Sequence, residues 1–157
     1  FVALMGAGFS AFLVPPLMAL SEAIAANGNL HGRNFFAAIV ACIALFNLAN
    51  LVPVWKFDGG QVLRQIVPGG AALAAASFAI LGGFLLVGHA AGFSMRLLIV
   101  AGAVFALLSL ITAGSGVRPR AELKPASLLG RSALGAALLA VMAIHAIGVW
   151  WAFTLLA

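Results

Sequence analysis

The sequence predicts an all-α protein, a polytopic transmembrane helix bundle with about five spanning helices and a broken segment at 53–69. Hydrophobic residues make up 65% of the chain and charged residues only 7%, whereas soluble domains carry roughly 25% charged residues. The mean hydropathy is +1.22. Several apolar runs also exceed the ~18 residues that are typical of a membrane-spanning helix. A soluble globular protein is therefore excluded.

The first two expected spans precede the broken segment. One covers about Val2–Ala26 and contains Pro15-Pro16, which neighbouring membrane helices can accommodate at the cost of a kink. The next runs from Asn34 to about Val52. Pro53 ends it, because proline lacks a backbone donor and clashes with the preceding turn. A short helix with polar flanks is expected over Gly59–Val67.

Three further spans are expected after the broken segment, at about Ala71–Gly88, Met95–Thr112 and Ser127–Leu156. The last run is longer than the ~20 residues that a crossing requires, so we expect it to tilt or to project from the bilayer at its Arg131 end. The stretch 114–125 is rich in glycine, proline and charges and is typical of an exposed loop. Because this loop joins spans, residues 1–157 are expected to form a single integral membrane domain.

Basic residues are distributed unevenly between the two sides of the predicted bundle. With alternating spans, only Arg33 and Arg96 fall on one side. The other side is cytoplasmic by the positive-inside rule, which places Asp58 near the cytoplasmic end and the C-terminus on the outer side. The net charge of +5 is explained by topology and anionic lipid, and no basic patch interleaved with aromatics suggests nucleic acid. The cytoplasmic set is Lys56, Arg64, Arg118, Arg120, Lys124 and Arg131.

One polar stretch, residues 50–60, stands out within the apolar sequence. It holds Asp58, followed by Gly59 and Gly60. A carboxylate inside a membrane protein is costly and usually has a partner such as a cation, a metal or water. Glycines allow backbone or ligand to approach closely. Asp58 is therefore the first candidate for a functional side chain.

The same stretch resembles a known family. Asn50-x-x-Pro53, followed after four residues by Asp58-Gly59-Gly60, resembles the Asn-Pro-Asp-Gly segment of the site-2 protease family, which consists of intramembrane zinc metalloproteases. The resemblance implies that Asp58 is a zinc ligand and that Asn50 and Pro53 lie where a transmembrane protein substrate is held unwound. It also implies peptide hydrolysis near the cytoplasmic face, with Gly59 and Gly60 supporting the site.

A second, shorter motif lies one helix upstream. Gly6-Ala-Gly-Phe-Ser10 resembles the Gly-x-x-x-(Asn/Ser/Gly) motif of the same family. Small residues at this spacing are also an ordinary signal of helix packing in membranes. Gly6 and Ser10 are therefore supporting residues of the predicted site.

The family also requires an H-E-x-x-H helix, which the sequence lacks. The three histidines, His31, His89 and His145, are followed by Gly or Ala. In H-E-x-x-H, two histidines bind zinc from one helical face and the glutamate is the general base. The catalytic base and two zinc ligands must therefore come from elsewhere. We expect the chain, which opens with Phe1, to be the C-terminal portion of a longer one, and zinc as cofactor depends on that missing helix.

Other interpretations remain open. Asp58 could be a helix N-cap, and Lys56 could pair with it. His145, expected near the outer leaflet, is most often a packing residue in such a setting. The chain could be a catalytically inactive homologue that acts as a scaffold or accessory subunit among partner membrane subunits. A transporter is less favoured, because it predicts a repeated pair of interrupted helices and only one interruption is evident.

Overall fold

The computed structural model describes residues 2–54, 57–67, 70–90, 92–114 and 126–156. Within these ranges every regular element is an α-helix, and the predicted all-α fold is confirmed. Four helices are long and apolar enough to cross a membrane: α1 (Val2–Ala26), α2 (Leu30–Leu51), α4 (Gly70–Ala90) and α6 (Leu128–Leu156). This is typical of an integral, multi-pass membrane protein.

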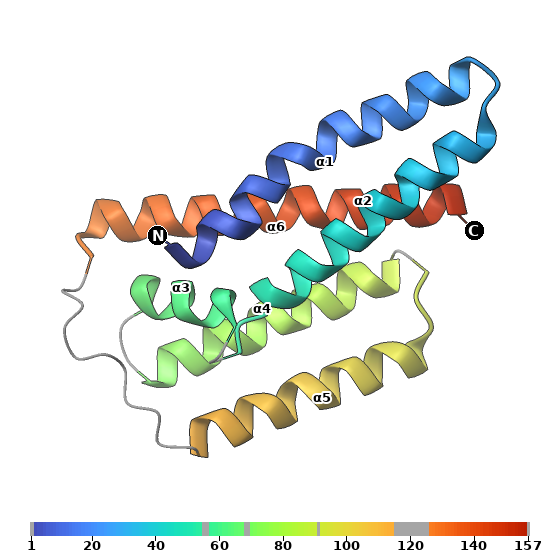
Figure 1. Ribbon diagram of the computed structural model, residues 1–157. Coiled ribbons are helices and arrows are strands. Elements are labelled where there is room, and N and C mark those ends of the chain that lie inside the picture. Colours follow the sequence, from blue (N-terminus) through green and yellow to red (C-terminus); the bar gives the residue numbers. More distant parts are fainter. Residues whose placement is uncertain (1, 55–56, 68–69, 91, 115–125, 157) are drawn as a thin grey trace. The chain divides into compact units, whose positions relative to one another are not determined.

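The two remaining helices are α3 (Asp58–Ile66) and α5 (Met95–Gly114). Helix α5 corresponds to the span expected over Met95–Thr112, and its apolar part with described side chains, Met95–Leu108, is shorter than the four helices above. Helix α3 is the expected short helix and has only nine residues. The six helices can be followed along the chain in Figure 1.

The helices form two compact units. The first comprises Phe1–Leu51 and Ala136–Ala157, and the second comprises Val52–Gly135. Helix α6 therefore contributes its first two turns to the second unit and the rest of its length to the first. A single domain over 1–157 stays a prediction.

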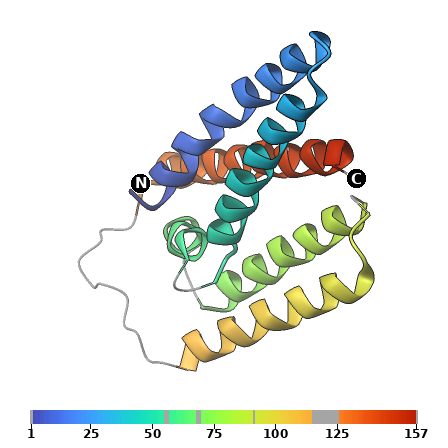
Figure 2. The ribbon, with the colours of Figure 1, turned by 45° about the vertical axis from the view of Figure 1, so that its right-hand side comes forward.

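In the first unit, α1 and α2 form an antiparallel hairpin (Figures 1 and 2). The tight turn between them uses Gly28 at φ +78°, a conformation that glycine adopts without steric cost. Asn29 caps α2, because its Oδ1 accepts the Gly32 N–H at 2.8 Å. Helix α1 continues through Pro15-Pro16 without interruption.

Small residues bring α6 close to the hairpin. Gly148 of α6 lies so near Val14, Val40 and Ala44 that an added Cβ would meet all three within 3.4 Å. Around this point the buried core is formed by Val14, Val40, Ala41 and Ala152. Van der Waals packing of small residues is the main force between membrane helices, and this cluster holds the three helices of the first unit together.

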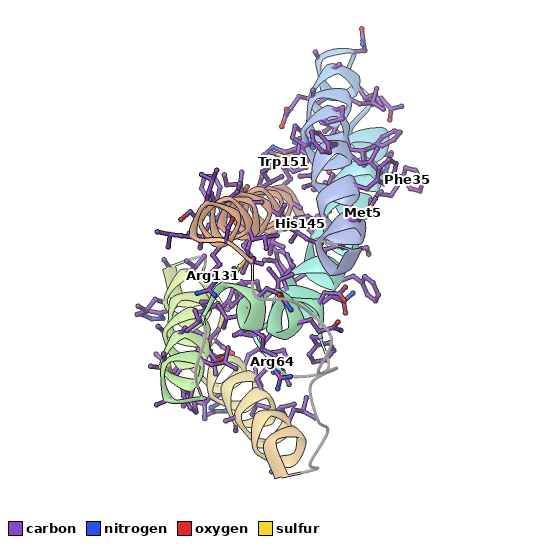
Figure 3. The ribbon with its side chains drawn as sticks, turned by 90° about the vertical axis from the view of Figure 1, so that its left-hand side faces the viewer. Met5, Phe35, Arg64, Arg131, His145 and Trp151 are labelled. Atoms are coloured by element: carbon purple, nitrogen blue, oxygen red, sulfur yellow. The ribbon has the colours of Figure 1, made fainter. Side chains whose placement is uncertain are left out.

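Large apolar side chains cover the outside of the helices. Phe12 is 81% exposed and Phe9 is 69% exposed, and Met5 and Phe35, labelled in Figure 3, are exposed as well. Exposed apolar patches of this extent are unusual on soluble monomers. They are the surface expected of helices that contact lipid acyl chains.

In the second unit, α4 and α5 form another helical hairpin. Gly92, at φ +85°, closes its turn, with hydrogen bonds from the Gly92 and Phe93 N–H groups to the carbonyls of His89 and Gly88. Gly88 packs against the first turns of α5, where an added Cβ would come within 2.8 Å of Leu98 Cδ2. Gly88 therefore permits the close approach of α4 and α5 at this point. At Gly82 and Gly83 an added Cβ would meet nothing within 4 Å.

Candidate functional site

The break predicted at Pro53 lies where the sequence places it. Helix α2 ends at Leu51, and Val52-Pro53-Val54 follow as a non-helical, buried segment. The chain turns tightly here, since the Val54 N–H donates to the Val52 carbonyl at 2.7 Å and the Phe57 N–H to the Val54 carbonyl at 2.9 Å. These local bonds satisfy backbone groups that a buried segment cannot leave unpaired.

Asp58 is the first residue of α3. Its N-cap is Phe57, in an extended conformation (φ −85°, ψ 159°), and no side chain caps this end of the helix. The interpretation of Asp58 as the N-cap is therefore corrected: the carboxylate belongs to the first helical turn. It is stabilised there by the partial positive charge of the helix N-terminus.

The Asp58 side chain is half-buried. Among the residues that the structure describes, no hydrogen bond or ion pair engages its carboxylate. The proposed pairing with Lys56 falls outside the described residues. Within the described surroundings, both oxygens of the carboxylate thus keep their lone pairs for a ligand.

The two glycines after Asp58 are part of the interior of their unit. Gly59 and Gly60 are both buried, as are Val62 and Leu63 one turn later. The apolar side of α3 therefore packs inward, and the absence of side chains at Gly59 and Gly60 lets neighbouring atoms approach the backbone next to Asp58.

Two arginines belong to the second unit as well. Partial burial lowers the pKa of the Arg64 guanidinium on α3 from its ordinary value, yet a guanidinium stays charged at neutral pH. Arg131 lies in the first turn of α6, one turn before Gly135, whose added Cβ would contact Ile66 of α3 at 3.8 Å. The start of α6 thus packs beside the end of α3 (both arginines are labelled in Figure 3).

Asn50 and Pro53 lie in different units. Asn50 is half-buried in the last turn of α2, in the first unit, whereas Pro53 and Asp58 belong to the second. No described residue hydrogen-bonds the Asn50 side chain. Its neighbour Asn47, by contrast, donates from Nδ2 to the Ile43 carbonyl at 2.7 Å. Asn50 is thus the asparagine of α2 whose amide has no partner in the described part of the chain.

Gly6 and Ser10 both lie on α1, but they have different surroundings. Gly6 is exposed, and an added Cβ would meet nothing within 4 Å. The Ser10 hydroxyl is engaged: Oγ lies 2.9 Å from the Ala7 carbonyl and 3.1 Å from Nε2 of His145 on α6. The sequence motif did not indicate this partner.

His145 is a buried residue of α6 with polar contacts. Its side chain is fully buried, with 0% exposed, and its Nδ1 lies 2.8 Å from the Val141 carbonyl. Figure 3 shows it where α6 meets the helical hairpin. One signal could have found the contact: a histidine inside a membrane helix needs a polar partner, and Ser10 is the only hydroxyl in the first half of the first span.

Two further polar contacts join the helices of the first unit. Ser21, fully buried, donates its hydroxyl to the Arg33 carbonyl at 2.9 Å. Trp151 donates from Nε1 to Glu22 Oε1 at 3.1 Å. Glu22 is exposed. Trp151 thus links α6 to α1 as a hydrogen-bond donor.

The described residues do not by themselves form a metal site. No group of three or more His, Cys, Asp or Glu side chains among them could hold an ion. Catalytic zinc usually has three protein ligands and an open position for water. Asp58 could supply one of these, and the other two would have to come from outside the described part of the chain.

Comparison of the chain with protein-family models, with curated proteins and with solved structures finds no match. The resemblance to the site-2 protease family therefore rests on the residues of the two motifs alone.

Proposed function

We propose that this chain forms part of an intramembrane zinc metalloprotease of the site-2 protease type, which hydrolyses a peptide bond in a transmembrane substrate. One observation carries the proposal: Asn50, Pro53 and Asp58 lie in the sequence at a break between two membrane-length helices, α2 and α4. The break holds a carboxylate that no described residue engages. An unpaired acid at such a position is energetically costly, and it is therefore a candidate for a functional side chain.

The roles follow the motif. Asp58 would be a zinc ligand, with Gly59 and Gly60 giving access to the backbone beside it. Asn50 and Pro53 would lie along the unwound substrate, for which the amide of Asn50 offers a donor and an acceptor. Gly6 and Ser10, on α1, would be supporting residues. Zinc would supply a nucleophilic water of lowered pKa and polarise the scissile carbonyl.

The site would need a further helix with two ligands and the general base. Because the described residues offer a single ligand at Asp58, no catalytic step is assigned to them. The orientation proposed from the basic residues places this region on the cytoplasmic side, with the C-terminus outside.

The test is made on the full-length gene product. Purified wild type, Asp58→Ala and a control variant at an exposed carboxylate, Glu22→Gln, are compared for bound zinc and for cleavage of a transmembrane substrate. The proposal expects both to be lost in Asp58→Ala and retained in Glu22→Gln. Stoichiometric zinc together with proteolysis in Asp58→Ala would refute the role of Asp58.

A second function, that of a catalytically silent scaffold or accessory subunit, is favoured by one specific observation. No histidine of the chain is followed by glutamate, so the catalytic helix is not within it. Sequencing the gene upstream of the codon for Phe1 separates the two proposals. An intact H-E-x-x-H favours the protease, and a degenerate one favours the scaffold.

A further inference from the structure

The contact between His145 and Ser10 is a chain of hydrogen bonds that depends on the protonation of one ring. The Val141 carbonyl can only accept, so His145 Nδ1, 2.8 Å away, must carry a hydrogen. In a neutral imidazole the other nitrogen then has a free lone pair. Nε2 therefore accepts a hydrogen bond from the Ser10 hydroxyl, whose Oγ lies 3.1 Å away.

A second proton on the ring changes this contact. With both nitrogens protonated, Nε2 can only donate, and the Ser10 hydroxyl must turn its hydrogen to the Ala7 carbonyl at 2.9 Å. The ring and the hydroxyl then make one hydrogen bond more, because Nε2 donates to Oγ while the hydroxyl donates to Ala7, but a cation now sits in a fully buried position. Burying a charge without a counter-charge costs more than a single hydrogen bond returns.

Within the described residues of the first unit, no counter-charge faces the ring. The other ionisable side chains of that unit are Glu22, His31, Arg33 and Cys42. Glu22 lies twelve residues beyond Ser10, or about 18 Å along the helix, and accepts from Trp151. Arg33 lies at the same end, where its carbonyl meets Ser21, and His31 precedes it by two residues. Cys42 is exposed.

We infer that His145 and Ser10 form an acid-sensitive latch, which holds α6 against α1 while the imidazole is neutral and releases it when the imidazole is protonated. An exposed histidine takes up a proton below about pH 6.5. Acid therefore favours states in which His145 has left its buried position, and the stabilisation is present at higher pH and lost as the pH falls. The latch does not depend on the proposed hydrolysis at Asp58.

The latch acts at a defined point of the unit. Gly148, one turn beyond His145, packs directly against Val14, one turn beyond Ser10. Loss of the polar contact thus occurs beside the closest approach of the two helices. We expect acid to loosen this packing, because the close approach tolerates little displacement.

The experiment compares thermal unfolding of the full chain in lipid nanodiscs at pH 8 and pH 5. Four proteins are used: wild type, Ser10→Ala, His145→Gln and the double variant. Glutamine keeps an acceptor for Ser10 but does not titrate. Wild type is expected to lose roughly 3 °C or more in melting temperature at pH 5, and His145→Gln is expected to lose this pH dependence. Ser10→Ala should be less stable than wild type at pH 8 and equal to it at pH 5.

Two histidine variants outside the latch serve as controls, and specific outcomes would contradict the latch. His31→Gln and His89→Gln change exposed histidines and should keep the pH dependence of wild type. The latch is overturned if His145→Gln keeps that dependence, or if the coupling between Ser10 and His145 grows in acid. An independent measurement is the nitrogen NMR spectrum of the ring at pH 8, which should show the Nδ1–H tautomer. An Nε2–H tautomer would also overturn the assignment.

Discussion

Gly148 on α6 and Val14 on α1 meet so closely that a Cβ on Gly148 would lie 2.9 Å from Val14 Cγ1. Val14 is itself 1% exposed, so it has no free space into which it could move. This pair sets the distance between α6 and the α1–α2 hairpin. The polar contacts on either side, at His145 and at Trp151, depend on that distance.

Replacing Gly148 with alanine should therefore destabilise the first unit. Overpacking of a tight core costs about 1–3 kcal/mol, and the better helix propensity of alanine offsets about 1 kcal/mol of it. The matched control is Gly8→Ala on α1, where an added Cβ meets nothing within 4 Å. Thermal unfolding in one detergent should show a lower midpoint for Gly148→Ala and an unchanged or higher one for Gly8→Ala. Equal midpoints would contradict the close approach.

The hydrogen bond between Trp151 and Glu22 should contribute little to the free energy of unfolding. Because Glu22 is exposed, we expect a coupling of about 0.5 kcal/mol or less in a double-mutant cycle of Trp151→Phe and Glu22→Gln. Trp150→Phe is the control, since Trp150 is 55% exposed. It should show no coupling to Glu22→Gln, and a coupling equal to that of Trp151 would argue against the bond.

The Ser21 hydroxyl should contribute measurably to the free energy of unfolding, although the group is small. It is fully buried and donates to the Arg33 carbonyl, near the turn that joins α1 to α2. Ser21→Ala removes this bond at a cost of about 1 kcal/mol in the free energy of unfolding. Ser21→Cys keeps a donor at this position, though a weak one, so chemical denaturation should place it between alanine and wild type. A fully stable alanine variant would show that the bond contributes nothing.

Asp58 should be dispensable for folding. No described residue bonds its carboxylate, so Asp58→Asn loses only the favourable interaction with the helix N-terminus, about 0.3–1 kcal/mol. Leu63→Ala on the same helix removes a side chain that is 4% exposed and should cost about 2–5 kcal/mol. Thermal unfolding of both variants measures the difference. A large loss in Asp58→Asn would indicate a structural role for the carboxylate.

Much of this fold could be predicted from the amino-acid composition and from the positions of helix-breaking residues. Pro53 ends α2 two residues upstream, at Leu51, because proline acts locally and needs no tertiary information. A single span through Pro15-Pro16 was also expected, since membrane helices can accommodate such a pair, and α1 runs through it.

The candidate site was predicted in part. The position of Asp58 at the start of a short helix follows from the motif, although the cap is Phe57. The contact of Ser10 with His145 could not be predicted, since it joins residues 135 positions apart. Which face of α6 turns toward α1 is decided by the close fit at Gly148. In a helix that is apolar on all sides, periodicity does not identify that face.

Helix α3 has nine residues, so it extends about 13 Å along its axis, while a hydrocarbon core is about 30 Å thick. Such a rod is too short to carry the polypeptide from one aqueous compartment to the other. Helix α3 therefore adds no membrane crossing of its own between α2 and α4, the two membrane-length helices that flank it in the sequence.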